Sequence, residues 1–213
     1  MTKARAKRSA NVRRRGRPRG GTLSQDDIVR AALRLVERRG PEALGINEVA
    51  RQLGIQPASV YNHVEGVAAL RALVVASGYR ALLLELAPSE SAASARQALE
   101  GVARAFRTFA KAHPALYALM TQEPLPDGPQ KEELRGLVFA SLGGALLQLR
   151  VPKEHLVDAI RSLRSAVFGF IALEANGELE LGEPRMRSFD FMLETFLRGL
   201  EHEHYSISGR RRR

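Results

Sequence analysis

The side chains with the clearest chemical potential lie close together between Gln56 and His63. Ser59, Tyr61 and Asn62 stand there with the histidine, directly after a proline. Asparagine can pair bidentately with adenine, serine can bond several base edges, and tyrosine and histidine can reach phosphates. None of them is specific alone, but together, near the start of a helix, they are what reading a DNA major groove requires.

The elements that must position these side chains have the spacing of a helix-turn-helix, from Ile46 to Val64. Ala50 provides a small side chain where two helices cross, and Gly54 provides a turn residue that tolerates positive φ. Pro57 stands in the first turn of the second helix, where its missing N–H is no loss. The apolar residues that would close over the crossing are Val49, Leu53, Ile55 and Val60. An ordinary helical hairpin in a core could show the same pattern, so DNA binding needs support from the context.

A preceding helix is predicted from Gln25 to Arg39. Ser24 and Asp27 form a capping-box-like pair at its start, and Gly40-Pro41 ends it. Gly45 is a tolerable N-cap for the helix that begins at Ile46. Residues 23–66 are therefore expected to form a three-helix unit, with a recognition helix over about 57–64 as its last element.

Positive charge is concentrated at the two ends of the 213-residue chain. Residues 1–21 hold nine basic residues and no acid, and residues 210–213 are four arginines. Because the whole chain carries +10, residues 22–209 carry −3. Basic tails on a mildly acidic body favour a polyanionic partner, and nucleic acid is the foremost candidate.

The N-terminal arm, residues 1–22, contains Arg15-Gly16-Arg17-Pro18-Arg19, which resembles an AT-hook. Arginines on an extended Pro/Gly-rich backbone can lie in the narrow, electronegative minor groove of A·T-rich DNA. Arg15, Arg17 and Arg19 are therefore candidate minor-groove contacts. A solvated tail that makes only unspecific phosphate contacts is the alternative interpretation. Residues 206–213 form a second basic tail.

The sequence signatures of enzymes and metal sites are missing. The chain has no cysteine, which excludes disulfides and thiolate metal sites. It has no phosphate-binding loop, no His-Glu-x-x-His motif, and no strand before its glycine-rich arm. His202-Glu203-His204 could bind a metal, but a solvated helix end is the better interpretation. We therefore expect a protein that is not an enzyme and uses no cofactor or metal.

Targeting and membrane-spanning segments are also not indicated. No apolar run of signal-peptide length follows the basic N-terminus. The longest apolar run, Gly136 to Leu149, is too short to cross a bilayer, which takes about 20 residues. We expect a soluble, cytoplasmic protein.

Residues 67–205 are predicted to form a larger helical unit, which makes the fold class all-α. Three prolines between Glu123 and Pro129 mark a loop, and Gly143-Gly144 would allow a kink or a close helix approach. The expected helices span residues 67–86, 92–112, 114–120, 131–149, 153–175 and 185–203.

In combination, these residues resemble the DNA-binding domain of tetracycline-repressor (TetR) family transcription regulators. The resemblance covers about residues 24–72 and rests on Val49-Ala50-Arg51-Gln52-Leu53-Gly54-Ile55 and Val60-Tyr61-Asn62-His63-Val64. It implies an all-α homodimer whose recognition helices read a palindromic operator in double-stranded DNA. It also implies that residues 67–205 bind an effector and form the dimer, with helix 67–86 transmitting ligand binding to the DNA-binding unit.

The resemblance further assigns DNA contacts, with two departures from the family pattern. Tyr61 and His63 would touch phosphates, while most of the other contacts would face the groove. Gly45 stands where the family usually has Ser or Thr, and Val67 stands where a Lys usually grips the backbone. The long arm could compensate for both. The implied contact residues are Asn47, Gln56, Ala58, Ser59, Tyr61, Asn62 and His63.

The last two helices are the expected dimer interface. In the family they pack against their copies as a four-helix bundle, and here they carry more apolar surface than one stripe on each could bury. A second, looser resemblance, to the C-terminal domain of one TetR subgroup, rests on Phe168-Gly169-Phe170 and His113-Pro114-Ala115-Leu116-Tyr117. The candidate interface residues are Phe170, Leu173, Phe189, Leu193, Phe196 and Leu200.

An effector pocket is predicted among the middle helices. It would be apolar with few polar groups, and would suit a small lipophilic or aromatic effector. For any single one of these residues, a place in the core is the simpler interpretation, and helical spacing cannot separate the two. The candidate pocket residues are Phe106, Phe109, Tyr117, Met120, Phe139, Leu142 and Phe168.

Three functions compete on this sequence. The leading one is a dimeric, ligand-responsive regulator, a repressor that leaves its operator when effector binding separates the recognition helices. The second is an architectural DNA-binding protein that uses the arm and prefers A·T-rich sequence. The third is a helical enzyme that processes small molecules, which is weakest because no acid/base or nucleophile constellation supports it.

Overall fold

The computed structural model describes residues 23–86, 92–123, 125, 127–180, 182 and 184–202. The secondary structure of these residues is helical and contains no strand, which confirms the all-α fold class. The arginines predicted to enter the minor groove, Arg15, Arg17 and Arg19, lie outside the described residues, as do the C-terminal basic tail and the last two residues of the 202–204 motif.

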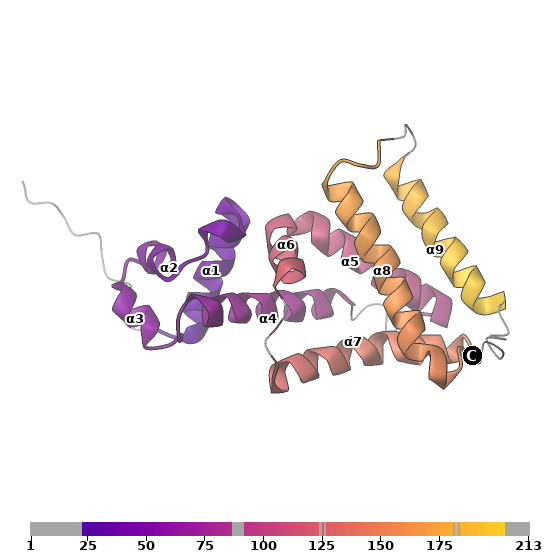
Figure 1. Ribbon diagram of the computed structural model, residues 1–213, viewed down its shortest axis with the longest axis horizontal. Coiled ribbons are helices and arrows are strands. Elements are labelled where there is room, and N and C mark those ends of the chain that lie inside the picture. The colour runs from indigo at the N-terminus through magenta and orange to yellow at the C-terminus, as the bar shows by residue number, and fades with distance from the viewer. Residues whose placement is uncertain are drawn as a thin grey trace, which may run out of the picture.

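The first helices form a small bundle at one end of the molecule (Figure 1). They are α1 (Gln25–Arg39), the short turn η1 (Pro41–Ala43), α2 (Ile46–Leu53) and α3 (Pro57–Tyr61). The predicted capping box is confirmed at the start of α1. The Ser24 hydroxyl accepts from the Asp27 backbone N–H at 3.2 Å, and the Asp27 carboxylate accepts from the Ser24 N–H at 3.0 Å.

The recognition helix is shorter than the sequence predicted. It ends at Tyr61, and the chain continues through Asn62 and His63 as a turn. Val64 follows with its side chain 3% exposed, because the chain has to fold back onto the bundle before the next helix. The contribution of Asn62 and His63 to any DNA contact therefore comes from the end of the helix and not from its middle.

Helix α4 (Val67–Leu86) connects this bundle to the rest of the molecule (Figure 1). It contacts α1 near its start and packs against α5, α6 and α7 further along. With a mean hydropathy of 1.6 it is long and apolar enough to cross a membrane, but here it serves as a central helix of the protein's own core. At Gly78 the α4 backbone comes so close to α6 that a Cβ atom would lie 2.6 Å from the Met120 sulfur.

The larger part of the molecule contains the remaining helices. They are α5 (Ala95–Ala112), α6 (Pro114–Gln122), α7 (Pro129–Gln148), the turn η3 (Lys153–His155), α8 (Leu156–Ala175) and α9 (Arg185–His202). Helix α5 starts three residues later than expected, because Ser94 caps it by accepting from the Gln97 N–H at 3.2 Å. Helix α7 starts earlier than expected, with Pro129 in its first turn, where proline is tolerated.

One buried ion pair ties three of these helices together. Arg107 on α5 and Glu174 on α8 have side chains that are each 7% exposed, and they form two parallel hydrogen bonds of 2.8 and 2.5 Å. The Arg107 guanidinium also lies over the Phe189 ring of α9, 5.2 Å from its centre. Burial raises the pKa of Glu174, but the hydrogen bonds and charge of Arg107 outweigh it, so this pKa lies below its ordinary value.

Candidate nucleic-acid interface and ligand cavity

The crossing of α2 and α3 has the geometry that the sequence predicted for a helix-turn-helix. Val49, Ala50 and Val60 are each 0% exposed where the two helices meet. Gly54 ends α2 with φ 70° and ψ 31°, the left-handed conformation that favours glycine. The chain then returns at once, because the Ile55 N–H donates to the Ala50 carbonyl at 3.0 Å.

Polar side chains that the sequence analysis did not single out hold this unit together. The Gln25 amide on α1 donates to the His63 carbonyl at 3.1 Å, which fixes the chain just after α3. Gln52 on α2 donates to the Ala31 carbonyl at 3.0 Å and accepts from Arg38 at 2.7 Å. Gln25 reaches the chain just after α3, and Gln52 reaches α1. The sequence could not indicate these roles, because they depend on how the three helices pack together.

The residues predicted to contact DNA lie on α3 and at its two ends, and on the first turn of α2. Tyr61 is 57% exposed, so its ring and hydroxyl are accessible to a partner. Ser59 and His63 are half-buried, and the exposed members of the predicted set are Asn47, Gln56, Ala58, Tyr61 and Asn62. These side chains therefore present hydrogen-bonding groups and one aromatic ring to solvent at the outer end of the molecule (Figure 1).

This surface carries no excess of positive charge. Residues 23–66 contain five arginines and six carboxylates, a net charge of −1. Glu48 binds Arg39 and Arg51, each at 2.7 Å, and the hydrogen bond from Arg39 holds the pKa of Glu48 below its ordinary value. Gly45 makes no side-chain cap and Val67 is 43% exposed, so both departures from the family pattern leave the surface without a polar group.

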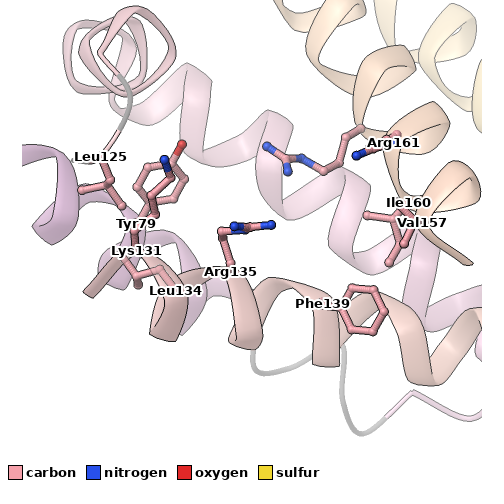
Figure 2. Close-up of a pocket in the computed structure, with 10 residues that line it drawn as sticks. Tyr79, Leu125, Lys131, Leu134, Arg135, Phe139, Val157, Ile160 and Arg161 are labelled. Carbon is pink, nitrogen blue, oxygen red and sulfur yellow. The ribbon is translucent and has the colours of Figure 1, made fainter. Parts of the chain in front are cut away.

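A cavity of about 470 Å³ lies between α4, α7 and α8 (Figure 2). Its size falls in the range of small-molecule sites. Of the seven predicted pocket residues only Phe139 borders it. Its lining is apolar in part, as predicted, but it also has four basic side chains and, among the described residues, no acid. The lining residues are Tyr79, Leu125, Lys131, Leu134, Arg135, Phe139, Val157, Ile160, Arg161 and Arg164.

The other six predicted pocket residues pack elsewhere, which corrects that prediction. Phe106 and Tyr117 both pack on Phe168, with ring centres 5.5 and 5.7 Å away. Phe106, Leu142 and Phe168 border a void of about 10 Å³, which is no larger than one water molecule needs, and Phe168 also borders an open hollow of about 290 Å³ beside Arg161 and Arg164. Phe109 and Met120 are buried at 3% and 5% exposure. Apart from Phe168, which also reaches a hollow on the surface, these aromatic and apolar side chains pack on one another in the core.

The prediction for the dimer interface needs a similar correction. Phe189, Leu193 and Leu200 are 0%, 2% and 6% exposed within the single chain, because α9 folds back onto α5 and α8. Phe170 and Phe196 are half-buried against the same core, while Leu173 is 41% exposed. The exposed apolar surface of α9 is instead at Met186 and Phe191, which are 50% and 73% exposed.

Two contacts join the larger part of the molecule to the helix-turn-helix unit. Arg71 on α4 donates to the Pro41 carbonyl at 3.0 Å and also pairs with Glu123, which directly follows α6. His113, at the junction of α5 and α6, contacts Glu37 of α1 at 3.1 Å. Both contacts bring α6 and its flanking residues against the unit that carries α3.

Two family models match the chain. The model described as "Bacterial regulatory proteins, tetR family" matches residues 28–64, and the model described as "Tetracyclin repressor-like, C-terminal domain" matches residues 99–196. The HTH-type transcriptional regulator Rv0681 of Mycobacterium tuberculosis is 30% identical over 176 residues, 78% of this chain and 81% of that protein. The HTH-type transcriptional regulator YobS of Bacillus subtilis is 29% identical over 185 residues, 86% of this chain and 95% of that protein.

Solved structures share the fold. A protein from Rhodococcus sp. RHA1 has a TM-score of 0.72 at 23% identity, over 87% of this chain and 100% of that one. The Streptomyces coelicolor protein ActR, in complex with (S)-DNPA, has a TM-score of 0.66 at 21% identity, over 85% of this chain and 98% of that one. BioQ, bound to its double-stranded DNA operator, has a TM-score of 0.62 at 22% identity, over 85% of this chain and 99% of that one.

Proposed function

Because the chain belongs to the TetR family of transcriptional regulators, we propose that it is a repressor that binds a palindromic operator as a homodimer and is released by a small-molecule effector. The observation that carries the proposal is the helix-turn-helix itself. Its crossing is closed by fully buried side chains, and α3 presents exposed polar groups at the outer end of the molecule. A single buried hairpin would have no reason to leave Tyr61 57% exposed.

Groove reading is assigned to Gln56, Ala58, Ser59 and Asn62, and phosphate contact to Tyr61 and His63, with Asn47 beside them. The exposed amide of Asn62 suits adenine, and each good bidentate base contact is worth about 1–3 kcal/mol of discrimination. The hydrogen bond from Gln25 to the His63 carbonyl supports this assignment, because it holds the end of α3 in one place relative to α1. A recognition helix that is held rigidly can discriminate between base sequences.

The electrostatic attraction for DNA comes from the arm. Residues 23–66 carry −1, whereas residues 1–21 carry nine positive charges, so most of the attraction for phosphates has to come from outside the helix-turn-helix. Arg15, Arg17 and Arg19 are the candidates for contacts in an adjacent A·T-rich minor groove. Deleting residues 1–21 should weaken operator binding and flatten its salt dependence, by about 0.9 in the slope for each phosphate that the arm neutralises.

The homodimer is proposed to form through α8 and α9. Leu173 on α8 and Met186 and Phe191 on α9 are exposed apolar side chains on neighbouring helices, and a second copy would cover them. Two copies would also supply the two recognition helices that a palindrome requires. Sedimentation velocity should report a dimer, and the variant Phe191→Glu should shift it to a monomer. Leu84→Glu on α4, at an apolar residue that is equally exposed, should not.

The function is tested by selecting bound duplexes from a random DNA pool at about 0.15 M salt. The expected result is an inverted repeat whose half-sites lie about one helical turn, or a multiple of it, apart. Enrichment of A·T tracts without symmetry would contradict the proposal, and would support the architectural function that the basic arm suggests.

A further inference from the structure

The cavity between α4, α7 and α8 has an unusual charge balance. Lys131 and Arg135 on α7 and Arg161 and Arg164 on α8 all border it, and none of the described residues that line it is a carboxylate. Like charges that converge on one hollow repel each other, so the arrangement is more favourable when an anion is present. Figure 2 shows Arg135 and Arg161 approaching the same space from α7 and α8.

The two arginines of α8 are the ones available to a ligand. Lys131 is engaged by Asp127 at 2.6 Å, and Arg135 by Glu132 at 3.0 Å. Neither Arg161 nor Arg164 has a carboxylate partner among the described residues. Arg164 instead lies over the Phe168 ring, 5.4 Å from its centre. They stand three positions apart on α8, so both can lie on one side of the helix, where two guanidinium groups can bind one carboxylate.

The rest of the lining is suited to hydrocarbon. Leu134 and Ile160 are buried at 3% and 7% exposure, while Phe139 and Val157 are each 45% exposed at the edge of the hollow. The exposed edge shows that the cavity opens to solvent, so a ligand can enter without unfolding the core. The apolar residues lie along α7 and α8 together with the basic ones, which defines a site with a cationic part and an apolar part.

We propose that the effector is a small amphipathic monocarboxylate, with its carboxylate bound by Arg161 and Arg164 and its hydrocarbon part packed against Leu134, Phe139 and Ile160. This inference rests on the proposed function and specifies the chemistry of its effector. It replaces the neutral lipophilic compound that an apolar pocket would have favoured.

The same cavity touches the contacts that lead to the DNA-binding unit. Tyr79 of α4 lines it, and Arg71, two helical turns earlier on α4, binds the Pro41 carbonyl. Leu125 also lines it, two residues after Glu123, which is the partner of Arg71. A ligand that displaces Tyr79 would move the helix that carries Arg71, and one that displaces Leu125 would move the segment that carries Glu123. Either displacement would therefore disturb the Arg71–Glu123 pair.

The test is calorimetric titration of the full-length protein with matched probes. Sodium octanoate and sodium 4-phenylbutyrate supply an alkyl and an aryl carboxylate. The alcohols 1-octanol and 4-phenyl-1-butanol supply the same hydrocarbon parts without the charge. We expect at least one carboxylate to bind ten-fold or more tightly than its alcohol, a difference of about 1.4 kcal/mol. Which carboxylate binds more tightly distinguishes a fatty acid from an aromatic acid as the natural ligand.

The variant Arg161→Gln/Arg164→Gln should lose this preference while it still binds the alcohol. The matched control is Arg80→Gln/Arg150→Gln, which removes the same charge from two exposed arginines that do not line the cavity, and it should keep the preference. The proposal is overturned if neither carboxylate binds better than its alcohol, or if the α8 double variant binds the carboxylate as the wild type does. A circular dichroism spectrum and a melting curve for each variant exclude unfolding as the cause.

Ligand binding and DNA binding are measured separately, so that the two proposals can fail separately. Carboxylate binding with no selected operator would overturn the proposed function and leave the ligand site standing. A selected operator whose complex is not released by the better-binding carboxylate at saturation would overturn the effector assignment and leave the repressor's DNA binding intact.

Discussion

The two ends of the molecule are built in different ways. The turn between α2 and α3 is closed by contacts between residues close in the sequence, such as the Ile55 N–H with the Ala50 carbonyl at 3.0 Å. The larger part depends on contacts between distant residues, such as Arg107 with Glu174, which are 67 positions apart. Local contacts leave a periodic signature in the sequence, whereas distant contacts leave none, and this difference decides which site could be predicted.

The largest expected effect comes from breaking the distant contact. Arg107→Leu leaves the buried Glu174 carboxylate with only the exposed Lys111 ammonium, 3.6 Å away, and this should lower the free energy of unfolding by about 3 kcal/mol, the lower end of the range for breaking a buried ion pair. Urea denaturation followed by circular dichroism measures it. Adding Glu174→Leu should recover most of the loss, since both charges are then gone. If the double variant is as unstable as Arg107→Leu alone, the unpaired carboxylate of Glu174 is not the cause of the lost stability.

A smaller effect tests the local geometry of the helix-turn-helix, using the same substitution at two glycines. Gly54→Ser forces a side chain into the left-handed region at φ 70°, which should cost about 1–2 kcal/mol although nothing obstructs its Cβ. Gly45→Ser has extended backbone and open space, and adds a capping hydroxyl to α2, so it should gain a few tenths of a kcal/mol. The measurement is thermal unfolding of the two variants. If both melting temperatures shifted in the same direction relative to the wild type, this comparison would be contradicted.

The start of α1 offers a third test within the local part. Ser24→Ala removes the hydroxyl that accepts from the Asp27 N–H, and the loss of an N-cap costs about 1 kcal/mol. Ser94→Ala removes the corresponding cap of α5, in the larger part. If local caps matter equally at both ends, the two variants will lose similar stability in urea, and a marked difference would show that tertiary packing dominates one of them.

The smallest expected effect is a dependence on acid pH. Hydrogen bonds from Ser24, and then the contact with Arg30, lower the pKa of Asp27 to about 2 from an ordinary value of 3.8. Folding thus favours the ionised form of Asp27. Its contribution to the free energy of unfolding is fully present above about pH 4 and is lost as the pH falls toward about 2. Urea midpoints measured across this range should fall less in Ser24→Ala than in the wild type.

The sequence predicted the helix-turn-helix closely because each feature there is local. The capping box, the turn glycine and the buried stripe are all set by residues within a few positions of one another. The end of α3 was placed too late, since only tertiary packing decides where the chain turns back. The departures at Gly45 and Val67 were visible because the family pattern gave a reference for each position.

The cavity could not be predicted in this way. Helical spacing identified aromatic residues that could face inward, but Phe106, Tyr117 and Phe168 use that position to pack on one another. The residues that line the space include arginines, which spacing alone assigns to a solvated surface. One signal was present: Arg161 and Arg164 follow Val157 and Ile160 at helical spacing, which places charged and apolar groups along one side of α8.

The close approach of α4 and α6 at Gly78 makes α4 a lever. A side chain there would collide with Met120, so α4 lies in close contact with α6 at this point, and we expect a tilt of α4 to pivot about it. From Tyr79 to Val67 is about 18 Å along the helix axis, at 1.5 Å per residue. A tilt of about 6° at the cavity would therefore move the far end by nearly 2 Å, several times the roughly 0.5 Å range of N–H···O hydrogen-bond lengths. If the protein is the repressor proposed above, a small displacement of α4 by its ligand would then be enough to move the recognition helix out of register on DNA.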